Sequence, residues 1–307
     1  MYLTKYKPIV FLFFLFFIFS GCANYQFNRM KKFTQKKEFL NMVRINDTLY
    51  VDKSEMSNIG WQEFMSWNKK IEEALPMIHP DTSFWYRFDT CLTKLSMTYH
   101  VDPDFFYYPV VNIDQRQANL YSKWRTERVF EGFLHHFKFR KISLKKGNLY
   151  NFKMEDFYEN DLVATKFPKD KLLYPHFRLP TEEEWLLIAH YADSIESKIY
   201  KHSLHESCKD YYPCFWSNIL PCENDTLKWK PTRNVNECCG PYDSKIIYNI
   251  RGNVSEWTSE PNTAMGGSWK DKRHIILKHP KSKETSANSW TGFRNVMVWR
   301  KWTGSTD

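Results

Sequence analysis

Glycine is scarce in this chain, which has ten glycines in 307 residues. That scarcity argues against a glycine-dense, phosphate-binding loop, and the sequence contains neither such a loop nor an internal repeat. The apolar run from Ile9 to Phe19 has eleven residues, whereas a membrane-spanning helix needs about 20. The sequence also lacks a CxxC pair, which removes the commonest ligand spacing of structural zinc sites.

The N-terminus is typical of a lipoprotein signal peptide. Lys5 and Lys7 precede the apolar run, which ends in Phe19-Ser20-Gly21-Cys22. A basic flank, a short apolar core and small residues before a cleavage site make a signal peptide. Small residues followed by Cys resemble a bacterial lipobox. We therefore expect a signal peptide over 1–21 and lipidation of Cys22, since several acyl chains hold a protein firmly at a membrane. A short membrane anchor is the alternative.

Residues 22–40 are predicted to form a lipidated and basic tether. Ala23-Asn24-Tyr25-Gln26 lacks the acidic cluster that, in gliding bacteria, resembles a surface-export signal. We therefore expect an outer-membrane lipoprotein that faces the periplasm. The net charge is +9, and part of it lies in the tether, at Arg29, Lys31, Lys32, Lys36 and Lys37. These residues favour attraction to anionic headgroups, or a solvated tether. Export argues against nucleic acid as a partner.

The remaining cysteines predict disulfides, because the expected compartment is oxidising. They are Cys91, Cys208, Cys214, Cys222, Cys238 and Cys239. The sequence does not choose among their pairings. A zinc site at His202, His205 and Cys208 is the alternative, but no convincing fourth ligand is present.

Three helix starts are indicated by capping residues. Thr181 with Glu184 has the capping-box pattern, and Asp114 with Gln117 repeats it. Ser57 is typical of a third N-cap. The helix after Ser57 should bury residues at helical spacing, namely Trp61, Phe64, Met65 and Ile71. Short strand-like runs precede the three helices, at 48–56, 108–113 and 177–179.

Five motifs occur in order along the chain. They are Glu55-Met56-Ser57-Asn58, Tyr108-Pro109-Val110-Val111-Asn112-Ile113, Arg178-Leu179-Pro180-Thr181-Glu182-Glu183-Glu184-Trp185, Asn249-Ile250-Arg251-Gly252-Asn253-Val254-Ser255-Glu256-Trp257, and Gly266-Gly267-Ser268-Trp269 with Gly292-Phe293-Arg294. The ordered set resembles the formylglycine-generating-enzyme, or sulfatase-modifying-factor, domain. The resemblance implies an α+β, C-type-lectin-like fold that is rich in loops, with short strands and a few capped helices. It would cover 41–300, with insertions near 138–170 and 194–215 and a tail at 301–307.

The segment 249–257 is predicted to bind calcium. An extended strand places Gly252, Val254 and Glu256 on one side. Two carbonyls, the Glu256 carboxylate and the Asn249 side-chain oxygen would be hard oxygen ligands of the kind that Ca²⁺ prefers. The resemblance implies a structural calcium site at the same four positions. The alternative is that Glu256 hydrogen-bonds loop amides while Trp257 fills the core.

The resemblance also implies two cysteines after Ser268, which in the enzymes bind copper and oxidise a substrate cysteine. Those positions fall on Lys272, or on Asp271 with a shift of one, and on Ile276. None of these residues can supply a thiolate, the ligand that suits Cu(I). Ser268 has no base placed by a motif and is therefore no nucleophile. We expect neither copper nor catalytic residues, and hence a catalytically silent protein.

The double-glycine motif, Gly292-Phe293-Arg294 and the lipidated N-terminus together resemble the gliding-motility lipoproteins. Those proteins use the fold as a structural part of the type IX secretion and gliding apparatus. The resemblance predicts an assembly component that binds other envelope proteins and no small-molecule substrate. One alternative is an enzyme whose active site draws on Asp271, Arg273, His274 and Glu284. Another is a lectin-like glycan binder with exposed aromatics, although most aromatics are expected in the core.

Overall fold

The computed structural model describes residues 42–68, 75–88, 93–136, 153–159, 173–202, 216–217, 234–235, 245–271, 276 and 280–303. All seven cysteines lie outside these residues, so the lipidation and disulfide predictions lie outside them as well. The chain divides into two compact units. Unit 1 comprises Met1–Phe39, Thr126–His176 and Trp299–Asp307, and unit 2 comprises Leu40–Arg125 and Phe177–Val298.

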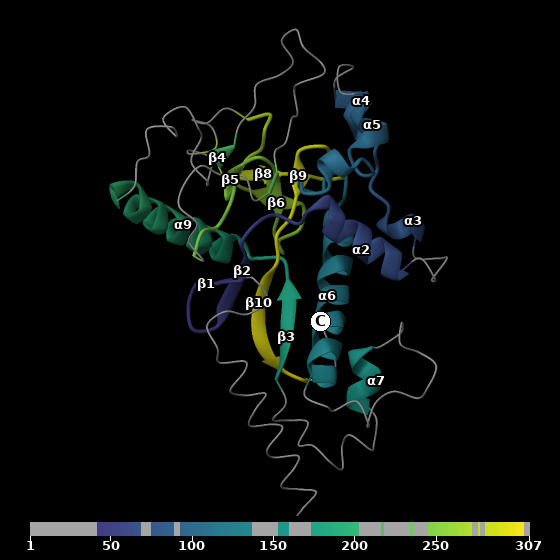
Figure 1. The fold of residues 1–307 in the computed structure, drawn as a ribbon, viewed down its shortest axis with the longest axis vertical. Coiled ribbons are helices and arrows are strands. Elements are labelled where there is room, and N and C mark those ends of the chain that lie inside the picture. Colours follow the sequence, from purple (N-terminus) through teal and green to yellow (C-terminus); the bar gives the residue numbers. More distant parts are fainter. Residues whose placement is uncertain are drawn as a thin grey trace, which may run out of the picture. The chain divides into compact units, whose positions relative to one another are not determined.

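The described residues form an α+β fold, as the sequence predicts (Figure 1). Its helices are α2 (Asn58–Asn68), α3 (Leu75–Ile78), α4 (Phe84–Phe88), α5 (Leu95–Thr98), η2 (Pro103–Phe105), α6 (Gln115–His136), α7 (Met154–Glu159) and α9 (Glu182–His202). Its strands are β1 (Met42–Arg44), β2 (Leu49–Asp52), β3 (Leu173–Arg178), β4 (Trp216–Ser217), β5 (Arg251–Gly252), β6 (Ser255–Trp257), β7 (Thr263–Met265), β8 (Lys281–Lys283), β9 (Thr291–Gly292) and β10 (Val296–Lys301). Within the described residues, no helix combines the length and apolar character needed to cross a membrane.

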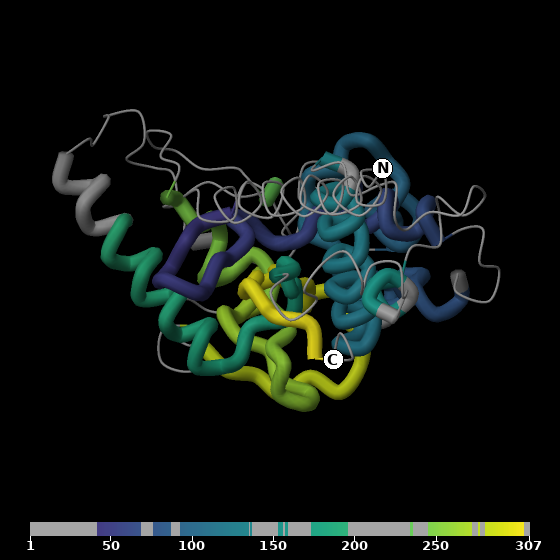
Figure 2. The backbone as a smooth tube through the Cα atoms, turned by 90° about the horizontal axis from the view of Figure 1, so that it is seen from below, coloured from purple at the N-terminus to yellow at the C-terminus, as the bar shows by residue number. Residues whose placement is uncertain are grey.

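Two four-stranded sheets contain most of the described strands, and β4 pairs in parallel with β5 in a separate two-stranded sheet. One of the four-stranded sheets has the order β1-β2-β10-β3, so the C-terminal strand β10 pairs antiparallel with β2, with Val296 opposite Val51. The β1–β2 hairpin is drawn in purple in Figure 2. Its turn is held by Asn46, whose Oδ1 accepts hydrogen bonds from the backbone N–H groups of Thr48 and Leu49, each at 2.9 Å. The other sheet has the order β8-β7-β6-β9 and contains the end of the segment 249–257.

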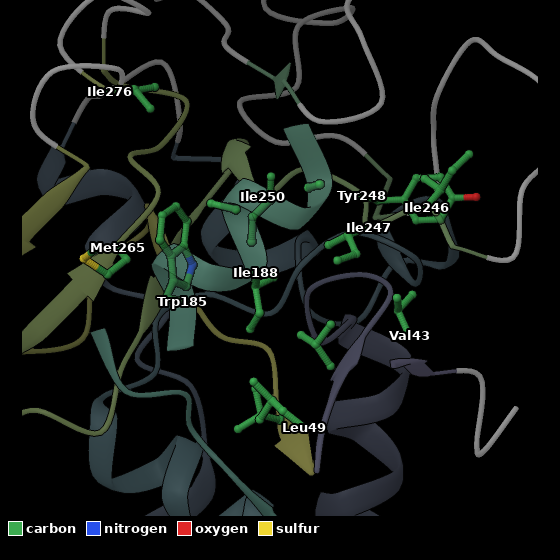
Figure 3. Packing of buried hydrophobic residues seen from close by; sticks show 14 residues of the cluster. Val43, Leu49, Trp185, Ile188, Ile246, Ile247, Tyr248, Ile250, Met265 and Ile276 are labelled. Atoms are coloured by element: carbon green, nitrogen blue, oxygen red, sulfur yellow. The ribbon is translucent and has the colours of Figure 1, made fainter. Parts of the chain in front are cut away.

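The main core of unit 2 lies where α9 meets the β1–β2 hairpin and the segment 246–250. Figure 3 shows Trp185 and Ile188 of α9 beside Ile250. Val51 and Val296, which face each other across the sheet, belong to the same cluster and are fully buried. Burial of several large aliphatic and aromatic side chains contributes about 2 kcal/mol each, which fixes α9 against this sheet.

A second core cluster confirms the first predicted helix. Trp61 and Phe64 are buried in α2, and Met65 packs against the same cluster. The Trp61 ring stacks on Tyr121 of α6 with centroids 5.7 Å apart. Ile71 lies outside the described residues.

All three predicted helix caps are confirmed. Thr181 Oγ1 accepts the Glu184 N–H at 3.1 Å, and Glu184 Oε2 accepts the Thr181 N–H at 3.0 Å. Asp114 and Gln117 make the same reciprocal pair, at 2.7 and 2.8 Å. The Gly60 N–H donates to Ser57 Oγ at 3.4 Å. These are contacts between residues three apart, which is why the sequence alone locates them.

One predicted strand is wrong and two are correct in part. β2 and β3 overlap the runs 48–56 and 177–179, but 108–113 forms no strand and makes only a bridge between Ser57 and Pro109. Pro109 lacks an N–H for a ladder. Asn112 has a φ of 61°, which turns the backbone away from the extended region.

The domain boundaries remain predictions. Of the expected insertion 138–170, the structure describes 153–159, which contains α7. The expected insertion at 194–215 starts inside α9, because that helix continues to His202. In unit 1, aromatic rings form a separate cluster in which Tyr158 stacks on Trp302 with centroids 4.4 Å apart.

Candidate functional site

The segment 249–257 is not one extended strand. It contains β5 and β6, and the backbone turns where β5 ends, because Gly252 and Asn253 have φ values of 80° and 56°. Asn249 also has a positive φ, of 50°. Residues in this left-handed region break the alternation of a strand, so the expectation that one extended strand aligns Gly252, Val254 and Glu256 is wrong. Asparagine and glycine are the residues that tolerate this conformation best.

Glu256 forms a fully buried ion pair with Arg294. Both side chains have a relative exposure of 0%. Arg294 Nε donates to Glu256 Oε1 at 2.7 Å, and Arg294 Nη2 lies 2.5 Å from the same oxygen. Trp185 Nε1 donates to Glu256 Oε2 at 2.9 Å. Burial by itself raises the pKa of Glu256, and the Arg294 guanidinium opposes that rise.

The Arg294 guanidinium also joins separate parts of unit 2. Its Nη2 donates to the Tyr248 carbonyl at 2.8 Å, and its Nη1 donates to the Asp52 carbonyl at 3.2 Å. Arginine has five N–H donors in a fixed plane, which suits it to several simultaneous contacts of this kind. The Glu256–Arg294 pair therefore connects β6, β2 and the segment that leads into β5.

Glu55 is a second buried carboxylate, beside the same loop. Asn253 Nδ2 donates to Glu55 Oε1 at 2.9 Å, and Asn249 Nδ2 donates to Glu55 Oε2 at 3.2 Å. Burial raises the pKa of Glu55 to about 7, although Arg294 and the hydrogen bond from Asn253 oppose the rise. The two left-handed asparagines are thus held by one acidic side chain from the first motif.

These contacts do not fit calcium at Glu256. Glu256 is the only carboxylate among the four predicted ligands, and its oxygens already accept hydrogen bonds from Arg294 and Trp185. A guanidinium beside the carboxylate neutralises it and repels a divalent cation. The Asn249 amide is turned toward Glu55 through its Nδ2. Among the described residues, no group of three His, Cys, Asp or Glu side chains is arranged to hold a metal ion. The calcium assignment remains a prediction.

The double-glycine turn lies next to this network. Gly266 and Gly267 have φ values of 98° and 67°. Ser268 donates from its N–H and its hydroxyl to Asp271 Oδ2, at 2.8 and 2.7 Å. Asp271 therefore closes the turn as a hydrogen-bond acceptor, at one of the positions to which the resemblance assigns a copper-binding cysteine.

The position of the second cysteine is filled by a core side chain. Ile276 is 1% exposed and belongs to the main core cluster. A Cβ built on Gly267 would lie 2.4 Å from Ile276 Cγ1, so Ile276 packs directly against the turn. Lys272, Arg273 and His274 lie outside the described residues.

Lys270 and Glu284 both contact the side chain of Trp290. Lys270 Nζ is 3.4 Å from the centroid of the Trp290 ring, whose Nε1 donates to Glu284 Oε1 at 3.3 Å. Desolvation lowers the pKa of Lys270, while Glu284 and Asp271 oppose the shift. Of the four residues considered for a non-cysteine active site, the structure describes Asp271 and Glu284. They make these separate contacts, to Ser268 and to Trp290.

Sequence reasoning missed Glu55 and Arg294 as partners of the segment 249–257. Both belong to motifs that were recognised, but nothing in their spacing shows that they meet. Glu55 is separated from Asn249 by 194 residues, and Arg294 is separated from Glu256 by 38. The sequence also did not indicate the Asp52–Arg125 pair, in which two hydrogen bonds measure 2.6 and 2.8 Å.

The sequence matches the family model of the sulfatase-modifying factor enzyme 1-like domain over residues 20–298. Two solved structures are similar to the chain. CarF is 15% identical, with 81% of this chain and 86% of that chain covered and a TM-score of 0.43. Variable protein 1 of Treponema denticola is 15% identical, with 81% and 84% covered and a TM-score of 0.40. No curated protein matches the chain.

Proposed function

This chain belongs to the sulfatase-modifying factor enzyme 1-like family, and from that premise we propose that it is a catalytically silent member. In this proposal it is anchored to the periplasmic face of the outer membrane through Cys22. It serves as a structural or assembly component of an envelope complex, such as a gliding-motility or type IX secretion apparatus.

The observation that carries the proposal is the absence of a thiol at Ile276 and at Lys272, or at Asp271 with a shift of one. Ile276 is buried in the core against Gly267, and Asp271 accepts two hydrogen bonds from Ser268. A Cu(I) ion needs soft ligands such as thiolates, and neither an isoleucine nor a hydrogen-bonded carboxylate provides one. The chain retains the motifs of the family, and at these positions it lacks the thiolates that would support the oxidation.

The buried polar network favours a structural role for the retained motifs. The polar atoms of Glu55, Glu256 and Arg294 form hydrogen bonds that join loops distant in the sequence. A scaffold that presents loops to protein partners requires this rigidity and requires no reactive group. The step from scaffold to envelope assembly rests on the lipobox-like N-terminus and on the resemblance to gliding-motility lipoproteins.

The test is crosslinking in intact cells, followed by detergent extraction and purification of the full-length chain through a C-terminal tag. We expect a reproducible set of crosslinked envelope proteins, and we expect that Cys22→Ser loses both the membrane fraction and these crosslinks. The same eluate is assayed for copper and for oxidation of a cysteine-containing peptide.

Two outcomes contradict the proposal in different ways. Stoichiometric copper together with aldehyde formation on the peptide overturns the silent assignment. A membrane-bound chain that crosslinks to no other protein overturns the assembly role and leaves the silent assignment standing. An untagged strain, processed in parallel, identifies proteins that bind the resin without the chain.

A further inference from the structure

A series of contacts links Asn112, the Asn288–Ser289 segment, Trp269 and Trp85 in unit 2. The Asn112 N–H donates to the Asn288 carbonyl at 2.8 Å, and the Asn112 carbonyl accepts the Asp81 N–H at 2.7 Å. Trp269 Nε1 donates to the carbonyl of Ser289, which follows Asn288, at 2.9 Å. Trp269 in turn stacks on Trp85, with centroids 6.4 Å apart and ring planes 19° apart. Trp85 lies four residues after Asp81, which closes the circuit.

Three members of this circuit have buried polar atoms without a partner. Within the described part of the chain, Trp85 Nε1, Asn112 Oδ1 and Ser289 Oγ make no hydrogen bond. Each of the three residues is 0% exposed. A buried polar group without a hydrogen bond costs free energy, and native proteins leave few of them. Three such groups in one circuit therefore point to a common partner that is not a side chain.

The orientation of the Asn112 amide is fixed by its neighbours. His100 Nδ1 lies 3.1 Å from Asn58 Oδ1, and Asn58 Nδ2 donates to the carbonyls of Tyr99 and Phe105. Asn58 Oδ1 is therefore an acceptor, so His100 carries its proton on Nδ1 and offers a lone pair at Nε2. Asn112 Nδ2 lies 3.4 Å from that nitrogen, which leaves Asn112 Oδ1 as the oxygen on the other side of the amide.

We propose that Trp85, Asn112 and Ser289 bind one ordered water molecule, which is a built-in part of the fold. The water accepts the Trp85 indole N–H and donates to Asn112 Oδ1. The water also forms a hydrogen bond with the Ser289 hydroxyl, which can either donate to the water oxygen or accept a proton from the water. Buried waters make about three hydrogen bonds of this kind. The water would join α4 to the segments around Asn112 and Ser289, and the Ser289 carbonyl accepts the indole N–H of Trp269 in the double-glycine motif.

The decisive variant is Ser289→Ala in the full-length chain, compared with the wild type by thermal unfolding in detergent. If the water is bound, the substitution removes one of its hydrogen bonds and lowers Tm by about 3 °C. If the three atoms are unpaired, the substitution removes a buried hydroxyl that has no partner. Tm then stays unchanged or rises, and that result overturns the proposal.

Ser282→Ala is the matched control. The Ser282 hydroxyl also lacks a partner in the described residues, but it lies half-buried in β8, outside the circuit. We expect its Tm to change by less than about 1 °C. A crystal structure of the wild type at about 2 Å provides the second measurement. A water peak within about 3.2 Å of all three atoms supports the site, and three atoms that face apart or enclose no density overturn it.

Discussion

The buried Arg294 side chain pairs with Glu256, which belongs to another of the retained motifs. Because the pair with Glu256 is fully buried, removing one partner leaves an uncompensated charge, which typically costs about 3 to 5 kcal/mol. We expect Arg294→Met to lower the free energy of unfolding by that amount in urea titrations. The double variant Glu256→Leu with Arg294→Met removes both charges and should recover much of the loss. A loss below about 1 kcal/mol for Arg294→Met would contradict the assignment.

His100 makes stability depend on pH. Burial lowers the pKa of His100 to about 3, with a further contribution from His79. The unfolded chain has a histidine pKa near 6.5, so below that pH the unfolded state binds the extra proton and folded stability falls. We expect a loss of roughly 2 to 3 kcal/mol from this group between about pH 6.5 and 4.5. The pH dependence should be measurably flatter in His100→Gln, whereas the same change at the exposed His190 in α9 should preserve it.

The helix α9 depends on its capping box. Thr181 Oγ1 holds the Glu184 N–H, and Glu184 Oε2 holds the Thr181 N–H and the Arg178 guanidinium. Burial raises the pKa of Glu184, but the hydrogen bonds from Arg178 and Thr181 outweigh burial and lower it. We expect Thr181→Ala to cost about 1 kcal/mol in urea unfolding, and Thr181→Ser to cost less because it retains the hydroxyl. Equal effects of the two variants would argue against the cap.

The double-glycine turn tolerates no Cβ at Gly267. A Cβ there would lie 2.4 Å from Ile276 Cγ1, at a φ of 67°. We expect Gly267→Ala to lower the free energy of unfolding by more than about 2 kcal/mol, from backbone strain and overpacking together. Adding Ile276→Ala to Gly267→Ala should relieve the overpacking and restore part of the lost free energy of unfolding. Gly132→Ala is the control, because that glycine is in α6 and its Cβ would meet nothing within 4 Å. It should stabilise by about 0.5 to 1 kcal/mol.

For the whole molecule, the metal content separates two interpretations of the segment 249–257. The sequence predicts a structural calcium ion there, whereas the described contacts give the Glu256 carboxylate to Arg294 and Trp185. We therefore expect less than one calcium per chain after dialysis and no rise in Tm on addition of millimolar calcium. Stoichiometric calcium that is lost in Glu256→Gln would restore the sequence-based assignment.

Local signals account for the parts of the fold that sequence reasoning located correctly. Each capping pair lies within one helical turn, and Trp61 and Phe64 repeat at helical spacing, so both patterns are visible without a structure. The run 108–113 misled because its apolar residues suggest a strand, while Pro109 and the left-handed Asn112 prevent one. The segment 249–257 misled similarly, because its positive φ values at Gly252 and Asn253 replace strand alternation with a turn.

The amino-acid sequence by itself determined the fold class, the helix starts and the absence of thiols at Ile276 and at Lys272 or Asp271. These features depend on residue type and on neighbours a few positions away. Only the tertiary structure decided what the retained polar residues do. Glu55 and Asn249 are 194 residues apart in the sequence. Whether their contact stabilises the fold depends on burial, which the spacing of residues does not reveal. Burial also pairs Glu256 with Arg294, because a charge excluded from water is stabilised by a counter-charge within the fold.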